Sequence, residues 1–291
     1  MNAIVQYLLS GLAMGGIYAL VGLGFYIMWS AAKAVNFAHG DTLMLGGVLT
    51  IVAVNVGIWM PFGILFAVFV TVAFGLAIER IGVRPFARYS GSIGWMLTTI
   101  AIGIMLETYV TVSFGAFARP MWSPMMERPL MIMGAGIYPQ ELFIIAFALV
   151  FVVFLELFYR RTQLGRALRA VAFNREASGM MGINVPRITA FAFGLAGGLG
   201  GVAGVLIGPV TSVSATMGLL IGLKGFVVFI MAGISSAYGV VAVGLAFGVI
   251  EKFVEGFGST TAREIVVFSL AIVVLLLYPQ GLFGQKDVVK V

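Results

Sequence analysis

The feature that most constrains this chain is a succession of continuously apolar runs, each about 18 to 25 residues long. A helix of that length crosses the hydrocarbon core of a bilayer, whereas the strands of an outer-membrane barrel alternate apolar and polar residues over about 10 positions. Hydrophobic residues make up 61% of the 291 positions and charged residues only 10%, proportions that an ordinary soluble domain does not reach. The sequence therefore predicts an all-α polytopic membrane protein.

The positions of these runs predict eight or nine transmembrane helices within one membrane domain, residues 1–291. Residues 218–233 form a run of only about 16 residues, so we expect either a ninth crossing or a re-entrant half-helix there. No Lys or Arg precedes Lys33, so the positive start of a cleavable signal peptide is missing and we expect the first run to be retained. The other runs cover residues 4–29, 35–56, 61–79, 94–114, 142–159, 188–208, 240–253 and 265–278.

The distribution of charge predicts which links face the cytoplasm. Residues 160–187 contain six of the 17 Lys and Arg residues against one acid, and residues 80–90 are also basic. The positive-inside rule places both links in the cytoplasm, and the nearly neutral link 115–140 outside. Because topology alone accounts for this positive charge, it gives no reason to expect a nucleic-acid partner.

The pattern of residues 160–187 predicts two short amphipathic helices. Leu164 and Leu168 recur at helical spacing on one face, and Arg166 and Arg169 lie on another. Positive charge that only sets the side of the membrane would not require an apolar face at helical spacing. The pattern therefore indicates contact with a partner groove or with the membrane-side core.

The second of these helices has start and stop signals of its own. Asn174 is a suitable N-cap, and Glu176 puts a negative charge into the first turn. Gly182 suits the left-handed conformation that ends a helix. Its apolar edge consists of Ala177, Met180 and Met181.

The residue types in the chain leave little room for catalysis. His39 is the only histidine and cysteine is absent. Neither a zinc-binding HExxH motif nor a GxSxG nucleophile motif occurs, and there is no Gly-Lys-Ser/Thr phosphate-binding loop. We therefore expect no enzymatic activity, no metal and no cofactor, and any ATP-driven role requires a partner subunit.

Ionisable groups inside membrane spans are costly and are therefore candidates for a translocation path. Glu107 lies within a span, and the alternative to a role in the path is that it is a hydrogen-bonded packing group. Lys224 lies in the short segment 218–233 and is expected to meet the carboxylate of a substrate or backbone carbonyls, or else to extend towards an interface. His39, beside Asn36 and Asp41, suits either a proton relay or capping and packing. The candidates for the translocation path are therefore Asn36, His39, Glu107 and Lys224. Three further charged residues are expected at the membrane interface, namely Glu251, Lys252 and Glu255.

A similar pattern occurs in both halves of the chain. A Gly-rich helix, a polar break and a Gly-Gly pair recur around residues 36–47 and 212–233. Interrupted hydrophobic segments in corresponding places of two repeats point to the substrate path of a transporter.

Four motifs together resemble the LivH-type permeases of branched-chain amino-acid ABC importers. They are SGLAMGGIYALVGLGF (10–25), VNFAHGDTLMLGG (35–47), LGRALRAVAFNREASGMMGINVPR (164–187) and GLKGFVVFIMAG (222–233). The resemblance spans nearly the whole chain. It implies a permease in the bacterial inner membrane that works with a second, related permease subunit, cytoplasmic ABC ATPase subunits and a periplasmic amino-acid-binding protein.

The same resemblance implies that residues 166–182 are the loop on which the ATPase docks. With the amphipathic pattern, the predicted docking set is Leu164, Arg166, Leu168, Arg169, Glu176, Ala177 and Gly182. Glu176, Ala177 and Gly182 match the Glu-Ala and Gly positions of the family's loop. The chain departs from the family at Phe173, where a polar or acidic residue is usual, and at residues 234–236, where a turn usually contains Gly. Aliphatic amino acids, amides and urea all remain open as substrates.

The favoured hypothesis is therefore a permease subunit that moves a small amino acid or amide inward by alternating access. A competing hypothesis is a self-sufficient secondary transporter or channel for a small polar solute, with Glu107, Lys224 and His39 as ion-coupling groups. A third is a membrane scaffold whose basic loop binds acidic lipid.

Overall fold

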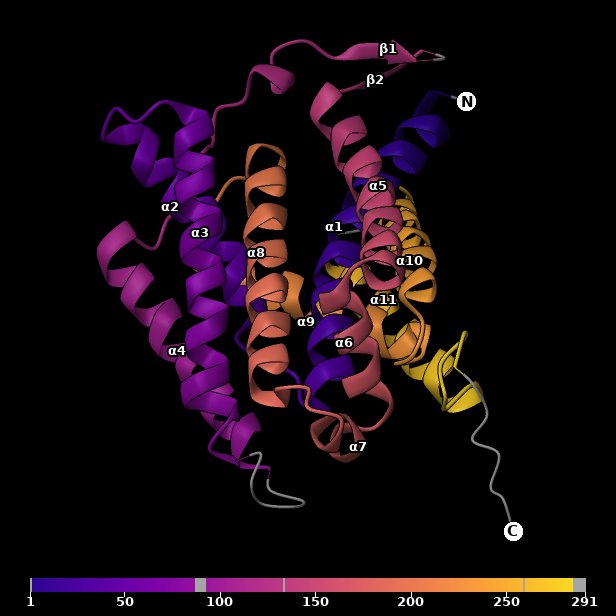
Figure 1. The fold of residues 1–291 in the computed structure, drawn as a ribbon. Coiled ribbons are helices and arrows are strands. Elements are labelled where there is room, and N and C mark those ends of the chain that lie inside the picture. Colours follow the sequence, from indigo (N-terminus) through magenta and orange to yellow (C-terminus); the bar gives the residue numbers. More distant parts are fainter. Residues whose placement is uncertain (1, 87–92, 133, 259, 285–291) are drawn as a thin grey trace.

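Long helices run side by side through most of the molecule (Figure 1). The computed structural model describes residues 2–86, 93–132, 134–258 and 260–284. The helices of the bundle are α1 (Asn2–Ala32), α2 (His39–Asn55), α3 (Met60–Ile78), α4 (Gly94–Phe114), α5 (Pro139–Arg161), α8 (Val185–Thr211), α9 (Met217–Ala232), α10 (Ala237–Phe257) and α11 (Thr260–Leu277). The predicted all-α membrane fold is confirmed.

Six helices in the described part of the chain are long and apolar enough to cross a membrane. They are α1, α4, α5, α8, α10 and α3, the last with its π-helical extension η1 (Glu79–Val83). The predicted count of eight or nine crossings stays a prediction. Helix α9 has 16 residues, as its sequence indicated, and α2 has 17, because it begins at His39 instead of residue 35.

Helices α1 and α8 form the centre of the bundle. Their most apolar segments are 72% and 78% buried, against 22% to 28% for the corresponding segments of α3, α4 and α5. Glycines allow the close packing. A methyl group added at Gly11 would lie 2.7 Å from the backbone of Val249 on α10, and one at Gly197 would overlap the backbone of Thr71 on α3. The Gly-rich runs thus place backbones in contact where no hydrophobic effect between helices is available.

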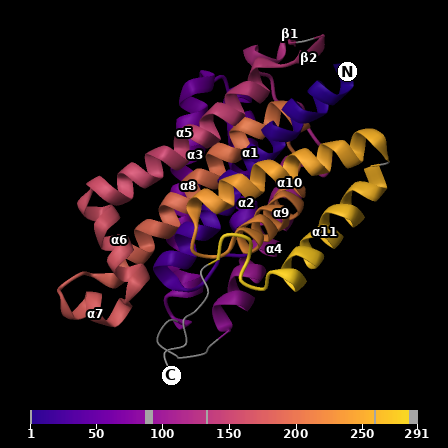
Figure 2. The same cartoon turned by 90° about the vertical axis from the view of Figure 1, so that its right-hand side faces the viewer.

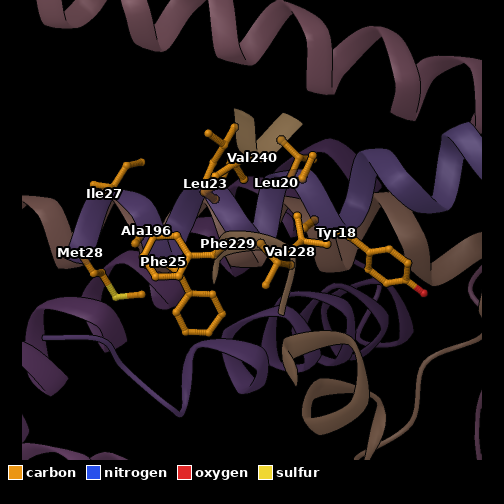
Figure 3. Packing of buried hydrophobic residues seen from close by; sticks show 14 of the residues in the cluster. Tyr18, Leu20, Leu23, Phe25, Ile27, Met28, Ala196, Val228, Phe229 and Val240 are labelled. Atoms are coloured by element: carbon orange, nitrogen blue, oxygen red, sulfur yellow. The ribbon is translucent and has the colours of Figure 1, made fainter. Parts of the chain in front are cut away.

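Side chains around the C-terminal half of α1 fill the core. Phe25 stacks on Phe229 of α9 with ring centroids 6.3 Å apart, and Tyr18 meets Phe247 of α10 edge to face. Figure 3 shows these α1 side chains with Val228 and Val240 close by. The shared core holds α8, α9 and α10 against α1.

The two ends of the bundle differ in their short elements. Helices α6 (Gln163–Phe173) and α7 (Arg175–Met180) lie at one end, and the N-terminus and a hairpin of β1 (Leu130–Ile132) and β2 (Ala135–Ile137) lie at the other (Figures 1 and 2). The separation agrees with the expected sides of the links 160–187 and 115–140. The antiparallel hairpin was not predicted, since three-residue strands are too short to produce a recognisable pattern.

Candidate functional site

Helix α2 begins about half-way along the bundle. A methyl group added at Gly200 of α8 would lie 3.2 Å from Cβ of Thr42 and 3.3 Å from Cε1 of His39, both in the first turn of α2. Gly200 lies 15 residues after the start of the 27-residue α8, or about 22 Å along a helix of about 40 Å. The chain after α1 therefore returns into the bundle before α2 starts.

The N-terminus of α9 meets that of α2 at the same depth. A methyl group at Gly40 would overlap the carbonyl oxygen of Gly218 and lie 2.9 Å from Cα of Gly222. Before α9, Val213 pairs with Arg119 in the link between α4 and α5, through N–H···O bonds of 2.8 and 2.9 Å. The two interrupted segments that the sequence indicated thus place two half-helix N-termini together.

A cavity of about 240 Å³ lies beside this meeting point. Helix α4 contributes one face to it, with residues at helical spacing, and α9 contributes another. Most of the lining is apolar, and no Lys or Arg of the described residues takes part in it. The lining residues are Phe25, Phe37, Gly40, Asp41, Ile100, Gly103, Ile104, Glu107, Gly218, Leu219, Gly222, Leu223 and Phe226.

Asp41 and Glu107 bring two carboxylates to this cavity. Asp41 is only 7% exposed, and within the described residues its carboxylate has neither a hydrogen bond nor an ion pair. A methyl group at Gly103 would lie 2.6 Å from its Oδ2, and one at Gly218 would lie 3.0 Å from its Oδ1. Glu107 lies near enough for the two charges to repel. Glu107 was among the predicted path residues, but Asp41 was not.

Asn36 and His39, the other candidates near this point, do not line the cavity. The Asn36 side chain accepts a hydrogen bond from the backbone N–H of Ala38 at 2.9 Å, which stabilises the turn before α2. His39 is fully buried, with its ring edge against Phe25 at a centroid distance of 4.8 Å. Both side chains therefore contribute to the turn and to packing, the structural alternative stated for His39.

Lys224 lies in a buried ion cluster outside the cavity. Its Nζ is 2.7 Å from Oε1 of Glu251 on α10 and 2.9 Å from Oε1 of Glu264 on α11. Arg263 also contacts Glu251, at 3.4 Å. The partner of Lys224 is therefore a pair of protein carboxylates, and the cluster ties α9 to α10 and α11.

Glu251 in this cluster differs from Lys252 and Glu255, with which the sequence grouped it, and the expected position of the three at the membrane interface stays a prediction. Glu251 is 2% exposed, whereas Lys252 and Glu255 are about a quarter exposed and pair with each other at 2.9 Å. Consecutive residues of a helix point 100° apart, so Glu251 faces the core while its neighbour faces out. Glu264, the second acid that binds Lys224, was also missed.

The loop of residues 160–187 has the two predicted helices, with Thr162 as the N-cap of α6 and Asn174 as the N-cap of α7. The Asn174 side chain accepts a hydrogen bond from the N–H of Ala177 at 2.9 Å. Gly182 adopts a φ of +84°, the left-handed conformation that was expected after α7.

The loop presents some of its predicted docking residues to solvent and buries others. Leu168 is 3% exposed and packs in the core, so it fixes α6 to the bundle and no partner can reach it. Leu164 is 46% exposed. The exposed members of the predicted docking set are Leu164, Arg166, Arg169, Glu176, Ala177 and Gly182. Three apolar side chains are even more exposed to solvent, namely Phe173, Met180 and Met181.

Helix α7 is bonded to the end of α1. Nη1 of Arg175 donates to the carbonyl oxygen of Ala32 at 2.7 Å, so this guanidinium is directed at α1. Partial burial lowers the pKa of the Arg175 guanidinium from its usual value, and Glu79 opposes that shift. Residues 33–38 connect Ala32 directly to the first turn of α2, so α7 is linked to the cavity by a short stretch of chain.

The family model for the permease component of branched-chain amino acid transport systems matches residues 7–277. The chain belongs to this family. The match covers the cavity and the loop of residues 160–187 together, and it confirms the resemblance carried by the four motifs.

Full-length relatives agree with this assignment. The chain is 31% identical to the high-affinity branched-chain amino acid transport permease BraD of Pseudomonas aeruginosa, over 99% of this chain and 98% of that protein. It is 29% identical to the permease LivH of Salmonella typhimurium, over 99% and 97%. A probable LivH permease of Methanocaldococcus jannaschii is 24% identical over 91% and 88%. The chain is thus a multi-pass permease component, like these relatives.

A solved structure shares the fold. PsaBC from Streptococcus pneumoniae, determined in complex with Fab, superposes with a TM-score of 0.52 and 14% identity, over 96% of this permease and 93% of that chain. At this identity the likeness concerns only the arrangement of helices.

Proposed function

We propose that this permease carries a branched-chain or related amino acid inward across the bacterial inner membrane by alternating access. The observation that carries the proposal is the cavity at the meeting of the α2 and α9 N-termini, half-way along the bundle. Substrate sites of transporters commonly lie near the bilayer midplane and are formed by discontinuous helices. The names of the relatives supply the substrate class.

ATP hydrolysis takes place on partner subunits in this proposal, because the sequence has no phosphate-binding loop. Phe173, Met180 and Met181 are each more than 80% exposed at the cytoplasmic end, and they support docking of α6 and α7 on an ATPase. Arg166 and Arg169 are exposed beside them and meet the polar rim of that interface. Movement of α7 passes through the Arg175 bond to Ala32 and on to α2.

A second permease subunit and a periplasmic amino-acid-binding protein complete the proposed transporter. The self-sufficient alternative receives less support from the described residues. Two carboxylates already neutralise Lys224, and His39 is packed away from the cavity, so neither is available as an ion-coupling group.

The docking proposal is tested by replacing Gly182 and Glu176 and by measuring ATPase association and uptake. Gly182→Ala forces a side chain into φ +84°, at a cost of about 1 to 2 kcal/mol, and should misplace the end of α7. Glu176→Ala removes the acid from the first turn of the same helix. We expect each to reduce association with the ATPase and amino-acid uptake severalfold.

Gly179→Ala is the matched control. Both glycines have open space where a side chain would project, but Gly179 lies within α7 and has no positive φ. Alanine favours a helix by about 1 kcal/mol over glycine, so this variant should associate normally. Unchanged association and uptake in the Gly182 and Glu176 variants would reject the docking role.

A further inference from the structure

The cavity beside α2 and α9 has an imbalance of charge that the transport proposal does not use. Asp41 and Glu107 are acidic, and the described residues contribute no Lys or Arg to its lining. Lys224 lies on α9 between two lining residues, Leu223 and Phe226, but is bound to Glu251 and Glu264. Both carboxylates therefore remain free to meet a cation from outside the protein.

Asp41 is the more constrained of the two. It is more than nine-tenths buried without a protein partner, and burial of an unpaired carboxylate is costly unless a cation joins it. The carboxylate fits against Gly103 and Gly218, because a methyl group at either position would crowd its oxygens. Both glycines and Asp41 line the cavity, so a ligand in the cavity can reach the carboxylate.

The apolar residues of the lining indicate the chemistry of the uncharged part of the ligand. Phenyl rings come from α1, from the link before α2 and from α9, and branched aliphatic side chains come from α4 and α9. A volume of about 240 Å³ lies below the roughly 300 Å³ at which drug-sized pockets begin. A small aliphatic molecule with one primary ammonium group matches both the charge and the walls.

We propose that Asp41 binds the ammonium group of the transported amino acid, with Glu107 as a second carboxylate along the same cavity. The inference rests on the proposed function, whose substrate it describes in more detail. It makes Asp41 a specificity-determining residue, because a solute without the ammonium group would leave the carboxylate buried and unpaired.

The test uses isoamylamine, which keeps the branched aliphatic chain and the ammonium group, and isocaproate, which keeps the chain but lacks that group. Thermal unfolding of the purified full-length permease is measured with each compound. We expect isoamylamine to raise the Tm of the wild type and isocaproate to leave it unchanged. The isosteric Asp41→Asn variant should lose the shift, and Glu107→Gln should weaken it.

The matched control is Glu156→Gln, which removes a carboxylate that pairs with Arg160 on α5, away from the cavity. This variant should keep the full isoamylamine shift. Equal shifts in the wild type and Asp41→Asn, or no shift in the wild type, would overturn the proposal. Because this readout needs no transport, it stays informative even if the wild type fails to take up amino acids.

Uptake by the complete transporter tests the two proposals separately. ATP-dependent uptake of leucine should fall about ten- to a hundredfold in Asp41→Asn, the range expected for a lost charge-assisted hydrogen bond, while assembly with the ATPase is unchanged. Wild-type rates in Asp41→Asn would contradict the ammonium site. Absence of uptake by the wild type would instead contradict the proposed function.

Discussion

At the scale of single residues, the glycines at which α2 meets α9 decide whether the two half-helices can meet at all. Gly40 lies against backbone atoms of Gly218 and Gly222, which cannot rotate away as a flexible side chain would. Gly222 makes the same contact from the other side, since a methyl group there would lie 2.7 Å from Cα of Gly40. The backbones at this point are therefore as close as the packing permits.

Gly40→Ala should force α2 and α9 apart and destabilise the permease by about 3 kcal/mol, because overpacking against rigid backbone is not relieved by a rotamer change. We expect a lower Tm and loss of uptake. Gly136→Ala in β2 is the control, since its added methyl group would lie an ordinary 3.7 Å from Sδ of Met131. A Gly40→Ala protein that is as stable and active as this control would show that the helices do not need this contact.

Residue identity alone revealed part of the site. Glu107 and Lys224 stood out because each is charged within an apolar run, yet only Glu107 lines the cavity. Asp41 was overlooked because it was read as a neighbour of His39, although an acid near the start of a membrane helix is a signal in itself. No sequence pattern reveals that Lys224 binds Glu251 and Glu264, since residues 27 and 40 positions away form the ion pairs.

At the scale of elements, the ion cluster around Lys224 holds three helices together. Lys224→Met should leave Glu251 buried without its principal cation and destabilise the fold by about 3 to 5 kcal/mol. The double variant Lys224→Met, Glu251→Gln removes both charges and should recover much of that loss. Thermal unfolding of the two proteins measures the difference.

The control for these variants is an ion pair outside the cluster. Arg160→Met and the double variant Arg160→Met, Glu156→Gln provide it, because this pair lies on α5 and the Arg160 side chain is 67% exposed. Exposed pairs contribute at most about 1 kcal/mol, so neither control should shift the Tm strongly. If Lys224→Met were as mild as Arg160→Met, the cluster would not stabilise the packing of α9 against α10 and α11.

The sequence predicted which segments are helical more completely than it predicted where along the bundle each helix begins. Apolar run length predicted the long helices, and caps at Asn174 and Gly182 predicted the ends of α7. The start of α2 at His39 did not follow, because residues 35–38 are apolar enough to extend a span but form a turn bonded through Asn36. Hydropathy measures composition, whereas the backbone bonds of that turn depend on neighbouring helices.

At the scale of the whole molecule, the cavity reaches the outer surface of the bundle between α4 and α9. Two of the residues that line it, Ile104 on α4 and Leu219 on α9, are 60% and 55% exposed. A path for a charged solute cannot face hydrocarbon, because polar groups there would have no partner. The face made by α4 and α9 is therefore where the second permease subunit is expected to cover the path.

The absence of cysteine makes this arrangement directly measurable. In the assembled transporter, Ile104→Cys should be joined to the second permease subunit by a short bifunctional thiol reagent when that subunit carries a cysteine at the equivalent position. Phe154→Cys is the control, since it is 54% exposed on α5, on the other side of the bundle from α4 (Figure 1). Cross-linking from Phe154 but not from Ile104 would place the second subunit on the opposite face, and the cavity would then need another cover. Cross-linking from Ile104 alone would enclose Asp41 and Glu107 between two permease subunits, as a path for a zwitterion requires.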